Sequence, residues 1–216
     1  NFLLADEINR TPPKTQSALL EAMEEGRITI DGTDYLLKPP FMVLATQNPI
    51  EYEGTYPLPE AQLDRFLMKL TVAYPERDEE KDILMKFHHG FSARNLENAQ
   101  MEKVLDAERL QACKNEIQKV IVEESIFSYI MDIVSATRQS HNLLLGASPR
   151  ASIALLLTAK TLAAMEGREY VIPDDIKYLS MPILRHRVIV SPEAEIEGIQ
   201  TDDVIRSILD QVKVPR

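Results

Sequence analysis

Glycine and cysteine are scarce in this sequence, whose 216 residues include seven glycines and one cysteine. Because a single cysteine cannot form a disulfide within the chain, the disulfide-linked frameworks of small secreted proteins are excluded. The glycines are scattered, and no two of them have the spacing G-x-x-x-x-G-K-[ST] or G-x-G-x-x-G. The residues given therefore contain neither of these glycine-rich phosphate-binding loops.

Long apolar runs and a surplus of basic residues are missing as well. The longest apolar candidate, Ala151–Met165, is interrupted by Lys160 and is shorter than the roughly 18 residues that a membrane-spanning helix needs. Nothing at the start of the chain has the pattern of a secretory leader. The 34 acidic and 24 basic residues give a formal net charge of −10. This balance argues against non-specific nucleic-acid binding, because phosphate neutralisation needs clustered Lys and Arg. We expect a cytoplasmic protein with no membrane insertion and no nucleic-acid partner.

The composition that is present is typical of a globular protein, with 44% hydrophobic and 27% charged residues. A chain of this size can bury a sizeable core, since it hides roughly 70% of its unfolded surface on folding. The first residue is Asn1, and the apolar run Phe2–Ala5 follows it at once. We therefore interpret the sequence as a fragment or a processed piece of a longer protein.

The first third of the chain has a mixed α/β pattern. Apolar runs typical of buried strands occur at residues 2–5, 41–45 and 67–72. A helix is predicted after the first strand, over about residues 11–25, and Gly26 ends it. Asp31-Gly32, between two alternating runs, predicts a hairpin.

The remainder of the chain, beyond a composition shift near Pro75, has helical periodicity. Helices are predicted at residues 76–87, 106–119, 124–138, 149–165, 173–184 and 202–212. This pattern divides the chain into a core at 1–75 and a helical domain at 76–216. Cys113 shares a helix face with Leu110 and Ile117 and is expected to be an inert core residue. The four histidines lack a third ligand at useful spacing, so we expect surface or packing roles for them rather than a metal site.

The first candidate site is Asp6-Glu7, which follows the strand Phe2–Ala5 directly. Open α/β sheets bind ligands at the carboxyl edge of their strands, where these two carboxylates would lie. The first could hold Mg²⁺ through its water shell, and the second could orient or deprotonate a water that attacks a γ-phosphate. The alternative is a pair of acidic residues that cap the next turn.

A second polar tip follows the strand Phe41–Ala45, which leads into Gln47-Asn48-Pro49. The Asn48 amide at the end of a neighbouring strand could lie beside the γ-phosphate and help to place the water. An Asx-turn before the proline is the commoner role for any single asparagine. The arrangement favours the functional interpretation, because two buried strands each deliver a polar group to the same edge.

Two arginines complete the set of candidates. Arg65 lies on a short amphipathic segment, and a guanidinium there could stabilise the charge of a transferring phosphoryl group. For Arg65 taken alone, a salt bridge with Asp64 or Glu60 is the plainer interpretation. Arg150 stands at the start of a predicted helix, where the positive partial charge disfavours an exposed cation. A bound anion explains a cation at that position better than helix stability does.

In this order and at these spacings, the elements resemble the MoxR family of AAA+ ATPases, and the resemblance covers nearly the whole chain. The similar stretches are Leu4–Glu25 (Walker B strand and the helix after it), Phe41–Pro49 (sensor 1 strand), Leu58–Phe66 (arginine-finger helix), Leu145–Ala151 (sensor 2 turn) and Glu166–Val188 (lid). The resemblance implies the three-layer α/β/α core of a P-loop NTPase, with a parallel sheet, at 1–75. An all-α lid domain with sensor 2 would follow at 76–216.

The resemblance also implies an ATPase that uses ATP and Mg²⁺, with a role for each candidate residue. Asp6 would be the Mg²⁺-associated carboxylate, acting through water, and Glu7 the catalytic carboxylate. Asn48 would be sensor 1, Arg65 the arginine finger and Arg150 the sensor 2 arginine. The sites of such ATPases lie between subunits of a ring, usually a hexamer, so Arg65 would act on a neighbour's nucleotide. Whether Arg150 acts within its own subunit or across the interface is left open.

In biological terms, the resemblance implies ATP-driven, chaperone-like remodelling or maturation of a client protein complex. A protein with a von Willebrand factor A domain is the partner that it suggests. The hairpin around Asp31-Gly32 corresponds to a pre-sensor 1 insertion that could transmit motion toward a pore, or it is a plain surface hairpin. Arg10, the stretch from Asp31 to Tyr35, and Glu60 match family positions whose roles cannot be separated from structural ones.

The sequence departs from the family pattern because the Walker A strand and loop are not among its residues. Without that strand we expect a gap in the sheet with unpaired edges. The 216 residues alone are expected neither to bind ATP tightly nor to hydrolyse it, which an ATPase assay on the isolated chain tests.

Two alternatives to a MoxR-type ATPase remain. The first is a magnesium-chelatase-like ATPase subunit, and the second is a non-catalytic helical interaction module with a degenerate nucleotide domain. The presence of all five candidate residue types speaks against the second.

Overall fold

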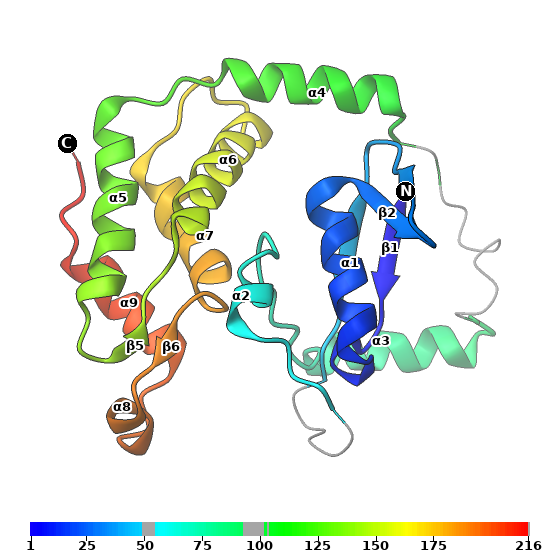
Figure 1. The fold of residues 1–216 in the computed structure, drawn as a ribbon, viewed down its shortest axis with the longest axis horizontal. Helices are drawn as coiled ribbons and strands as arrows, with labels where there is room; N and C mark the ends of the chain where they lie inside the picture. Colours follow the sequence, from blue (N-terminus) through cyan, green and yellow to red (C-terminus); the bar gives the residue numbers. More distant parts are fainter. Residues whose placement is uncertain (49–54, 93–101, 103, 216) are drawn as a thin grey trace. The chain divides into compact units, whose positions relative to one another are not determined.

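A computed structural model describes residues 1–48, 55–92, 102 and 104–215 (Figure 1). Contacts divide the described chain into two compact units. The first joins residues 1–69 with residues 116–216, and the second covers residues 70–115. These contact units differ from the predicted core at residues 1–75 and lid at residues 76–216. That predicted division into domains stays a prediction.

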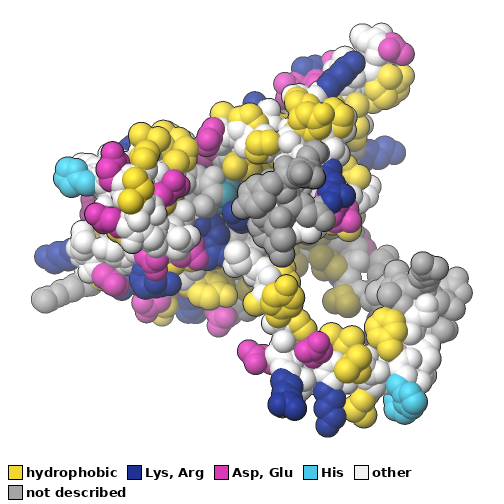
Figure 2. All heavy atoms as spheres, turned by 90° about the horizontal axis from the view of Figure 1, so that it is seen from below, with side chains coloured by type: hydrophobic (Ala, Val, Ile, Leu, Met, Phe, Trp, Pro, Cys, Tyr) yellow, Lys and Arg dark blue, Asp and Glu magenta, His cyan; other side chains and the backbone are white. Residues whose placement is uncertain are grey.

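A parallel pair of strands lies at the start of the first unit. β1 (Phe2–Ala5) pairs with β4 (Met42–Ala45), with Phe2 opposite Met42 and Ala5 opposite Ala45. Both strands therefore end at the same edge, as the sequence predicts. Their apolar side chains remain exposed within the described chain, 68% for Phe2 and 64% for Leu4, so the expectation of strands covered on both faces is wrong for the residues given. Figure 2 shows apolar side chains interspersed with charged ones on one face of the molecule.

The third predicted strand, residues 67–72, is also wrong. This segment has no regular structure, and its backbone bonds to the helical region instead of to a strand. The Lys69 N–H donates to the carbonyl of Pro182 at 2.8 Å, and the Leu67 carbonyl accepts from Arg187. Met68 packs against the apolar core of the helical region. Residues 67–69 therefore dock on the helical region, and the run does not form a strand.

Between β1 and β4 the chain forms a helix and a hairpin. A short 3₁₀ turn, η1 (Ile8–Arg10), leads into α1 (Pro13–Glu25), which Gly26 ends in the left-handed conformation with φ +62°. β2 (Arg27–Ile30) and β3 (Thr33–Leu36) then pair in antiparallel fashion. Asp31 and Gly32 at the turn both have positive φ, which matches the right-handed twist of a two-residue hairpin. The predicted hairpin is confirmed.

The helices of residues 116–216 enclose the main apolar core. They are α5 (Glu124–Gln139), α6 (Pro149–Met165), α7 (Pro173–Leu184), α8 (Pro192–Ile196) and α9 (Thr201–Gln211). Tyr129, Leu155, Ile176 and Ile205 are among the fully buried side chains of this core. The four long helices agree with the predicted ranges to within one residue at each end. The short pair β5 (Leu143–Leu145) and β6 (Ile189–Val190), and α8, are not predicted, because they are too short to show a periodicity.

The second unit contains α3 (Arg77–His88) and most of α4 (Ala107–Lys119), both close to their predicted ranges. Neither helix buries a residue. Cys113 is exposed, so its predicted core position is wrong. The periodicity identifies an apolar helix face correctly, but such a face becomes core only where another element covers it. No helix in the described part of the chain is long and apolar enough to cross a membrane.

Candidate active site

The ends of β1 and β4 are tied together by the hydroxyl of Thr46. Its Oγ1 donates to Asp6 Oδ1 at 2.5 Å and accepts from the Glu7 N–H at 2.8 Å. The Thr46 backbone also bonds on both sides, donating to the Ala5 carbonyl and accepting from the Ile8 N–H, each at 3.0 Å. Sequence reasoning missed Thr46, although a hydroxyl at the end of the second strand, opposite a carboxylate, was a usable signal.

Glu7 adopts an unusual backbone conformation at this edge. Its φ of 49° and ψ of 53° lie in the left-handed region, which few non-glycine residues occupy. Such strain gathers at functional positions when the surrounding bonds over-determine it, as those of Thr46 do here. The Glu7 carboxylate pairs with Arg10 at 3.2 Å, and both side chains are more than a third exposed. This contact gives Arg10 a structural partner, and its exposure keeps the carboxylate within reach of solvent.

Asn48 lies two residues beyond Thr46, half-buried at the same edge of the sheet. The edge that the sequence predicts is confirmed, because Asp6 and Thr46 meet there. The sensor 1 role of Asn48 stays a prediction, and the competing Asx-turn involves Pro49, which lies outside the described residues.

The oxygen donors at this edge, the Asp6 carboxylate and the Thr46 hydroxyl, suit Mg²⁺ held through its own water. One carboxylate and one hydroxyl do not supply enough protein ligands to enclose the ion without water. No group of three His, Cys, Asp or Glu side chains that could hold a metal ion occurs among the described residues.

Gln16, a residue that sequence reasoning missed, supports the turn behind this edge. Its side chain is 1% exposed, and its Nε2 donates to the carbonyls of Ile8 and Tyr56 at 3.1 and 2.9 Å. The Tyr56 N–H in turn donates to the Asn9 carbonyl. In the sequence, Gln16 is a polar residue on the apolar face of the helix predicted over residues 11–25, and this position could have marked it as buried.

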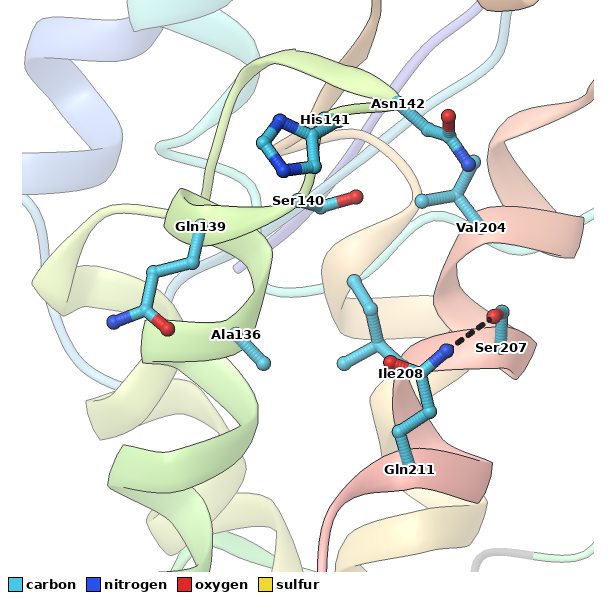
Figure 3. A pocket seen from close by; sticks show the side chains of 9 residues that line it. All are labelled: Ala136, Gln139, Ser140, His141, Asn142, Val204, Ser207, Ile208 and Gln211. Atoms are coloured by element: carbon cyan, nitrogen blue, oxygen red, sulfur yellow. Dashed lines mark hydrogen bonds between the residues drawn. The ribbon is translucent and has the colours of Figure 1, made fainter.

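A groove elsewhere on the molecule holds none of the predicted site residues. It has a volume of about 400 Å³ and lies between the end of α5 and α9 (Figure 3). Its lining is mainly polar, with Gln139, His141 and Asn142 on one side and Gln211 on the other. The groove is therefore not the candidate active site.

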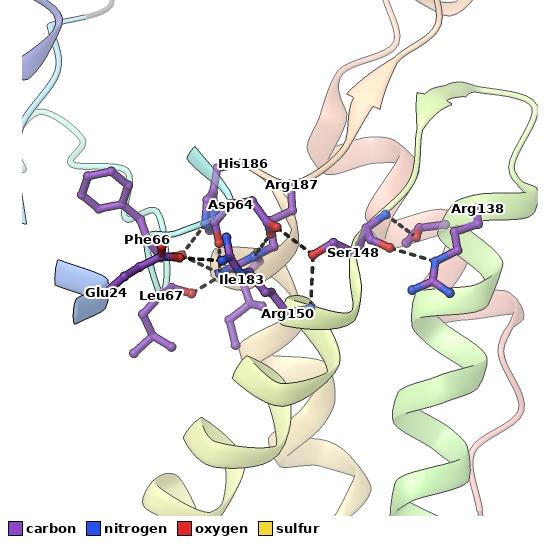
Figure 4. A network of polar contacts seen from close by, with 12 residues as sticks. Glu24, Asp64, Phe66, Leu67, Arg138, Ser148, Arg150, Ile183, His186 and Arg187 are labelled. Atoms are coloured by element: carbon purple, nitrogen blue, oxygen red, sulfur yellow. Dashed lines mark hydrogen bonds and ion pairs between the residues drawn. The ribbon is translucent and has the colours of Figure 1, made fainter. Parts of the chain in front are cut away.

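The two candidate arginines meet at a single carboxylate, that of Glu24 in the last turn of α1. Arg150 Nη2 lies 2.5 Å from Glu24 Oε1 (Figure 4). Arg65 Nη2 lies 3.2 Å from Glu24 Oε2. Arg65 thus forms an ion pair, but the partners expected from the sequence, Asp64 and Glu60, are wrong. All three side chains are about a third to a half exposed.

The length of α1 separates the arginines from the carboxylates of Asp6 and Glu7. Asp6 and Glu7 precede the helix, whereas Glu24 lies in its last turn. At about 1.5 Å per residue, residues 13 and 24 are about 16 Å apart along the axis. The structure therefore forms two groups from the predicted residues, Asp6 and Glu7 with the nearby Asn48 at one end of α1, and Arg65 with Arg150 at the other.

Asp64, the neighbour of Arg65, connects the α2 helix (Glu60–Leu63) to the helical region. Its Oδ1 accepts from Arg187 Nε at 3.0 Å and its Oδ2 accepts from Ser148 Oγ at 2.8 Å (Figure 4). Ser148 also caps α6 by accepting from the Arg150 N–H. The residues next to both candidate arginines are thus linked through one carboxylate.

Arg187 is buried, with 3% of its side chain exposed, and uses every donor that it has. The remaining four N–H groups donate to the carbonyls of Asp64, Phe66, Leu67 and Ile183. Burial lowers the pKa of Arg187 and the Asp64 carboxylate opposes that effect, so the guanidinium stays charged. Sequence reasoning missed this residue, because nothing in its surroundings marks it as buried.

His186 lies beside this joint, 8% exposed. Its Nε2 is 3.0 Å from the Phe66 carbonyl, so the proton of the neutral ring belongs on Nε2. Burial, with a smaller contribution from the charge of Arg187, lowers the pKa of His186 to about 4. The ring also lines a cavity of about 190 Å³ together with Asp64, Ser148 and Arg187.

Comparison with known families matches both ends of the chain. A family model described as "ATPase family associated with various cellular activities (AAA)" matches residues 1–68, and a model described as "AAA lid domain" matches residues 135–208. A crystal structure of a candidate ATPase from Cytophaga hutchinsonii superposes with a TM-score of 0.90 at 44% identity. It covers 100% of this chain, which covers 67% of that one. These matches confirm the predicted fold class.

Two individual relatives match along the whole chain. The chain is 53% identical to YeaC, an uncharacterized protein of Bacillus subtilis, and 40% identical to the chaperone MoxR1 of Mycobacterium tuberculosis. All of the chain is matched in both cases, and it spans 66% of the first relative and 58% of the second. A homologue of a magnesium-chelatase subunit from Methanocaldococcus jannaschii is more distant, at 28% identity over 87% of the chain and 50% of the relative.

We predict that Asp64→Ala lowers the free energy of unfolding by about 3 kcal/mol or more, because it leaves the buried guanidinium of Arg187 without its counter-charge. Chemical denaturation followed by circular dichroism measures the change. Glu116→Ala is the matched control, since it breaks an ion pair with Lys119 whose side chains are 69% and 70% exposed. That variant should lose less than about 1 kcal/mol. Equal losses in the two variants would show that the joint at Arg187 adds no particular stability.

We also predict that stability rises with pH between about 4 and about 6.5 because of His186. In this window the unfolded chain binds a proton at residue 186 that the folded chain does not, since the folded pKa is about 4 and the unfolded value is 6.5. The contribution reaches up to about 3 kcal/mol above pH 6.5. His186→Gln, which can still donate to the Phe66 carbonyl, should flatten the dependence relative to the parent protein. Parallel curves for the two proteins would contradict the lowered pKa.

Proposed function

The chain belongs to the MoxR family of AAA+ ATPases, and from this premise we propose that the whole protein is a ring ATPase that remodels or matures protein complexes. The 216 residues span about two thirds or less of the curated relatives YeaC and MoxR1, so activity is proposed for the whole protein and not for this chain alone. The isolated chain is expected to be inactive, because its residues contain no phosphate-binding loop.

The observation that carries the proposal is the separation of the predicted residues into two groups at the two ends of α1. Asp6 and Glu7, which Thr46 holds, form one group with Asn48, two residues beyond Thr46. Arg65 and Arg150 form the other, at Glu24. A carboxylate group and a cationic group that lie apart on one subunit can complete each other across the interface between neighbouring subunits. This arrangement supports a ring, and we propose a hexamer.

Each group has a chemical task in ATP hydrolysis. Bound Mg²⁺ would neutralise phosphate charge, and Asp6 would hold the ion through water. Glu7 would accept a hydrogen bond from the attacking water, orient it and take its proton as the water oxygen bonds to the γ-phosphorus. The bond from the γ-phosphorus to the β,γ-bridging oxygen would break in the same step, and ADP would leave with that oxygen. Asn48 would hold the same water or a γ-phosphate oxygen with its amide. The left-handed conformation and the Thr46 bond fix the backbone of Glu7 before substrate arrives, which lowers the cost of orienting its side chain.

Arg65 and Arg150 would both act on the nucleotide of a neighbouring subunit. Guanidinium groups stabilise the charge that develops on the transferring phosphoryl group, and an arginine supplied across an interface is the usual arrangement for a finger. The position of Arg150 beside Arg65, and at the far end of α1 from Glu7, favours action across the interface for both arginines. Of the two possibilities for Arg150, action within its own subunit or across the interface, we therefore propose the second.

Partners follow from the family premise. We propose that the ring acts with a protein carrying a von Willebrand factor A domain on a client protein complex, and that it is cytoplasmic. The name of the relative MoxR1 describes that protein as a chaperone. The magnesium-chelatase alternative has weaker support, because identity to the chelatase-subunit homologue is 28% against 40% to MoxR1. A non-catalytic module is disfavoured by the ordered Asp6–Thr46–Glu7 contacts, which a degenerate site does not need.

In the whole protein, Glu7→Gln is expected to abolish ATP turnover while nucleotide binding stays within a few-fold of the parent. Glutamine keeps the size of the side chain but cannot take a proton from the attacking water. Steady-state ATPase assays and equilibrium binding of a fluorescent ATP analogue measure the two quantities. If binding and turnover fall together, Glu7 has a structural role rather than the proposed catalytic one.

Arg65→Ala is expected to lower turnover by up to about 10³-fold, and mixing it with Glu7→Gln subunits should restore part of the activity. In mixed rings some interfaces combine the intact carboxylates of one variant with the intact arginines of the other. Arg150→Ala should be rescued in the same way, since an arginine that served its own subunit could not be replaced by a neighbour. Glu7→Gln mixed with the double variant Glu7→Gln/Arg65→Ala is the control without rescue. Failure of both rescues would exclude action across the interface.

A further inference from the structure

Glu24 stands out because one carboxylate holds both arginines, each through a different oxygen. Oε1 contacts Arg150 at 2.5 Å and Oε2 contacts Arg65 at 3.2 Å. Two guanidinium groups that converge on one point repel each other, and a carboxylate between them offsets that repulsion. The pair therefore keeps a net charge of about +1 instead of +2 while it is held in one place.

The positions of these charges on their helices are unfavourable when each helix is considered alone. Glu24 lies in the last turn of α1, where the partial charge of the helix is negative, and Arg150 lies in the first turn of α6, where it is positive. Across the contact the relation is reversed, since each side chain reaches toward a helix end of opposite sign. The stability of each helix alone does not explain why Glu24 and Arg150 stand at these positions, whereas the ion pair between them does.

The contact at Glu24 is not what joins the two parts of the chain. Asp64 binds Ser148 and Arg187 independently, and those bonds are less exposed than the ones at Glu24. Because Asp64 precedes Arg65 and Ser148 lies two residues before Arg150, the backbones of both arginines are positioned without Glu24. A change at Glu24 should therefore affect where the guanidinium groups point and leave the fold intact.

We propose that Glu24 is a positioning residue that holds Arg65 and Arg150 side by side as one two-guanidinium unit. The inference rests on the proposed function, in which that unit meets the phosphates of a neighbouring subunit's nucleotide. Each guanidinium uses Nη2 for Glu24, which leaves further N–H donors for phosphate oxygens. Glu24 thus orients the pair without occupying all of its donors.

The kinetic test compares Glu24→Gln with Glu25→Gln in the whole protein. Both changes remove one negative charge from the same helix turn, but Glu25 pairs with Arg27 and not with the two arginines. Glu24→Gln should lower kcat by about 10- to 100-fold, as expected for misplaced catalytic groups, with KM and melting temperature close to those of Glu25→Gln. In an Arg65→Ala/Arg150→Ala background the same change should have no further effect, because Glu24 acts only through the arginines. An equal effect in that background, or a kcat like that of the control, would overturn the proposal.

A second measurement does not depend on ATPase activity. The side-chain Nε–Hε resonances of Arg65 and Arg150 should both shift in Glu24→Gln and stay in place in Glu25→Gln, as recorded by ¹⁵N-correlated NMR. If neither resonance responds, the shared contact is absent and the proposal fails, whatever the kinetics show. If both respond but the parent protein has no ATPase activity, the contact stands and the proposed function fails. If the parent is active while Glu24→Gln behaves as the control, the function stands and the positioning role fails.

Discussion

The guanidinium of Arg187 lies almost entirely out of water, and each of its N–H groups finds an acceptor there. A buried cation without such partners would cost several kcal/mol, so the chain around it must bring four carbonyls and one carboxylate to fixed places. Three of those carbonyls belong to residues 64, 66 and 67, which is why that segment docks on the helical region instead of extending a sheet. The same carboxylate, Asp64, then fixes Ser148 at the start of α6. The positions of both candidate arginines follow from this joint.

Two sets of carboxylate–guanidinium contacts lie near α2 and α6, and they differ in how much solvent reaches them. This difference in exposure indicates different roles for the two sets. In the Asp64–Arg187 pair the guanidinium is buried and fully bonded, so the pair behaves as a structural joint whose disruption destabilises the fold. The contacts of Glu24 with Arg65 and Arg150 are open to water, where an ion pair contributes little to stability. An exposed pair can exchange one partner for a phosphate oxygen at low cost. A rigid Asp64–Arg187 pair next to an adaptable pair suits the proposed contact of Arg65 and Arg150 with the nucleotide of a neighbouring subunit.

Much of the fold and part of the candidate site could be predicted from sequence patterns. The helices of residues 116–216 and the Asp31-Gly32 hairpin were predictable because periodicity and turn chemistry act over a few neighbouring residues. The common edge of Asp6 and Thr46 followed from the parallel pairing of two apolar runs. Residues 67–72 and Cys113 were mispredicted for a shared reason. An apolar pattern shows that a segment can pack, but it does not show which element packs against it.

The sequence by itself determined the family, the order of the elements and the residue types available for ATP chemistry, since these depend on local patterns and motif spacing. Only the tertiary structure decided which of those residues meet. Glu24 and Arg150 are 126 positions apart, and Asp64 and Arg187 are 123 apart, so no local rule pairs them. Their contacts arise because burial of Arg187 brings the two halves of the first unit together. The division of the candidate site into a carboxylate end and an arginine end of α1 is therefore a property of packing, which the sequence encodes only through the whole fold.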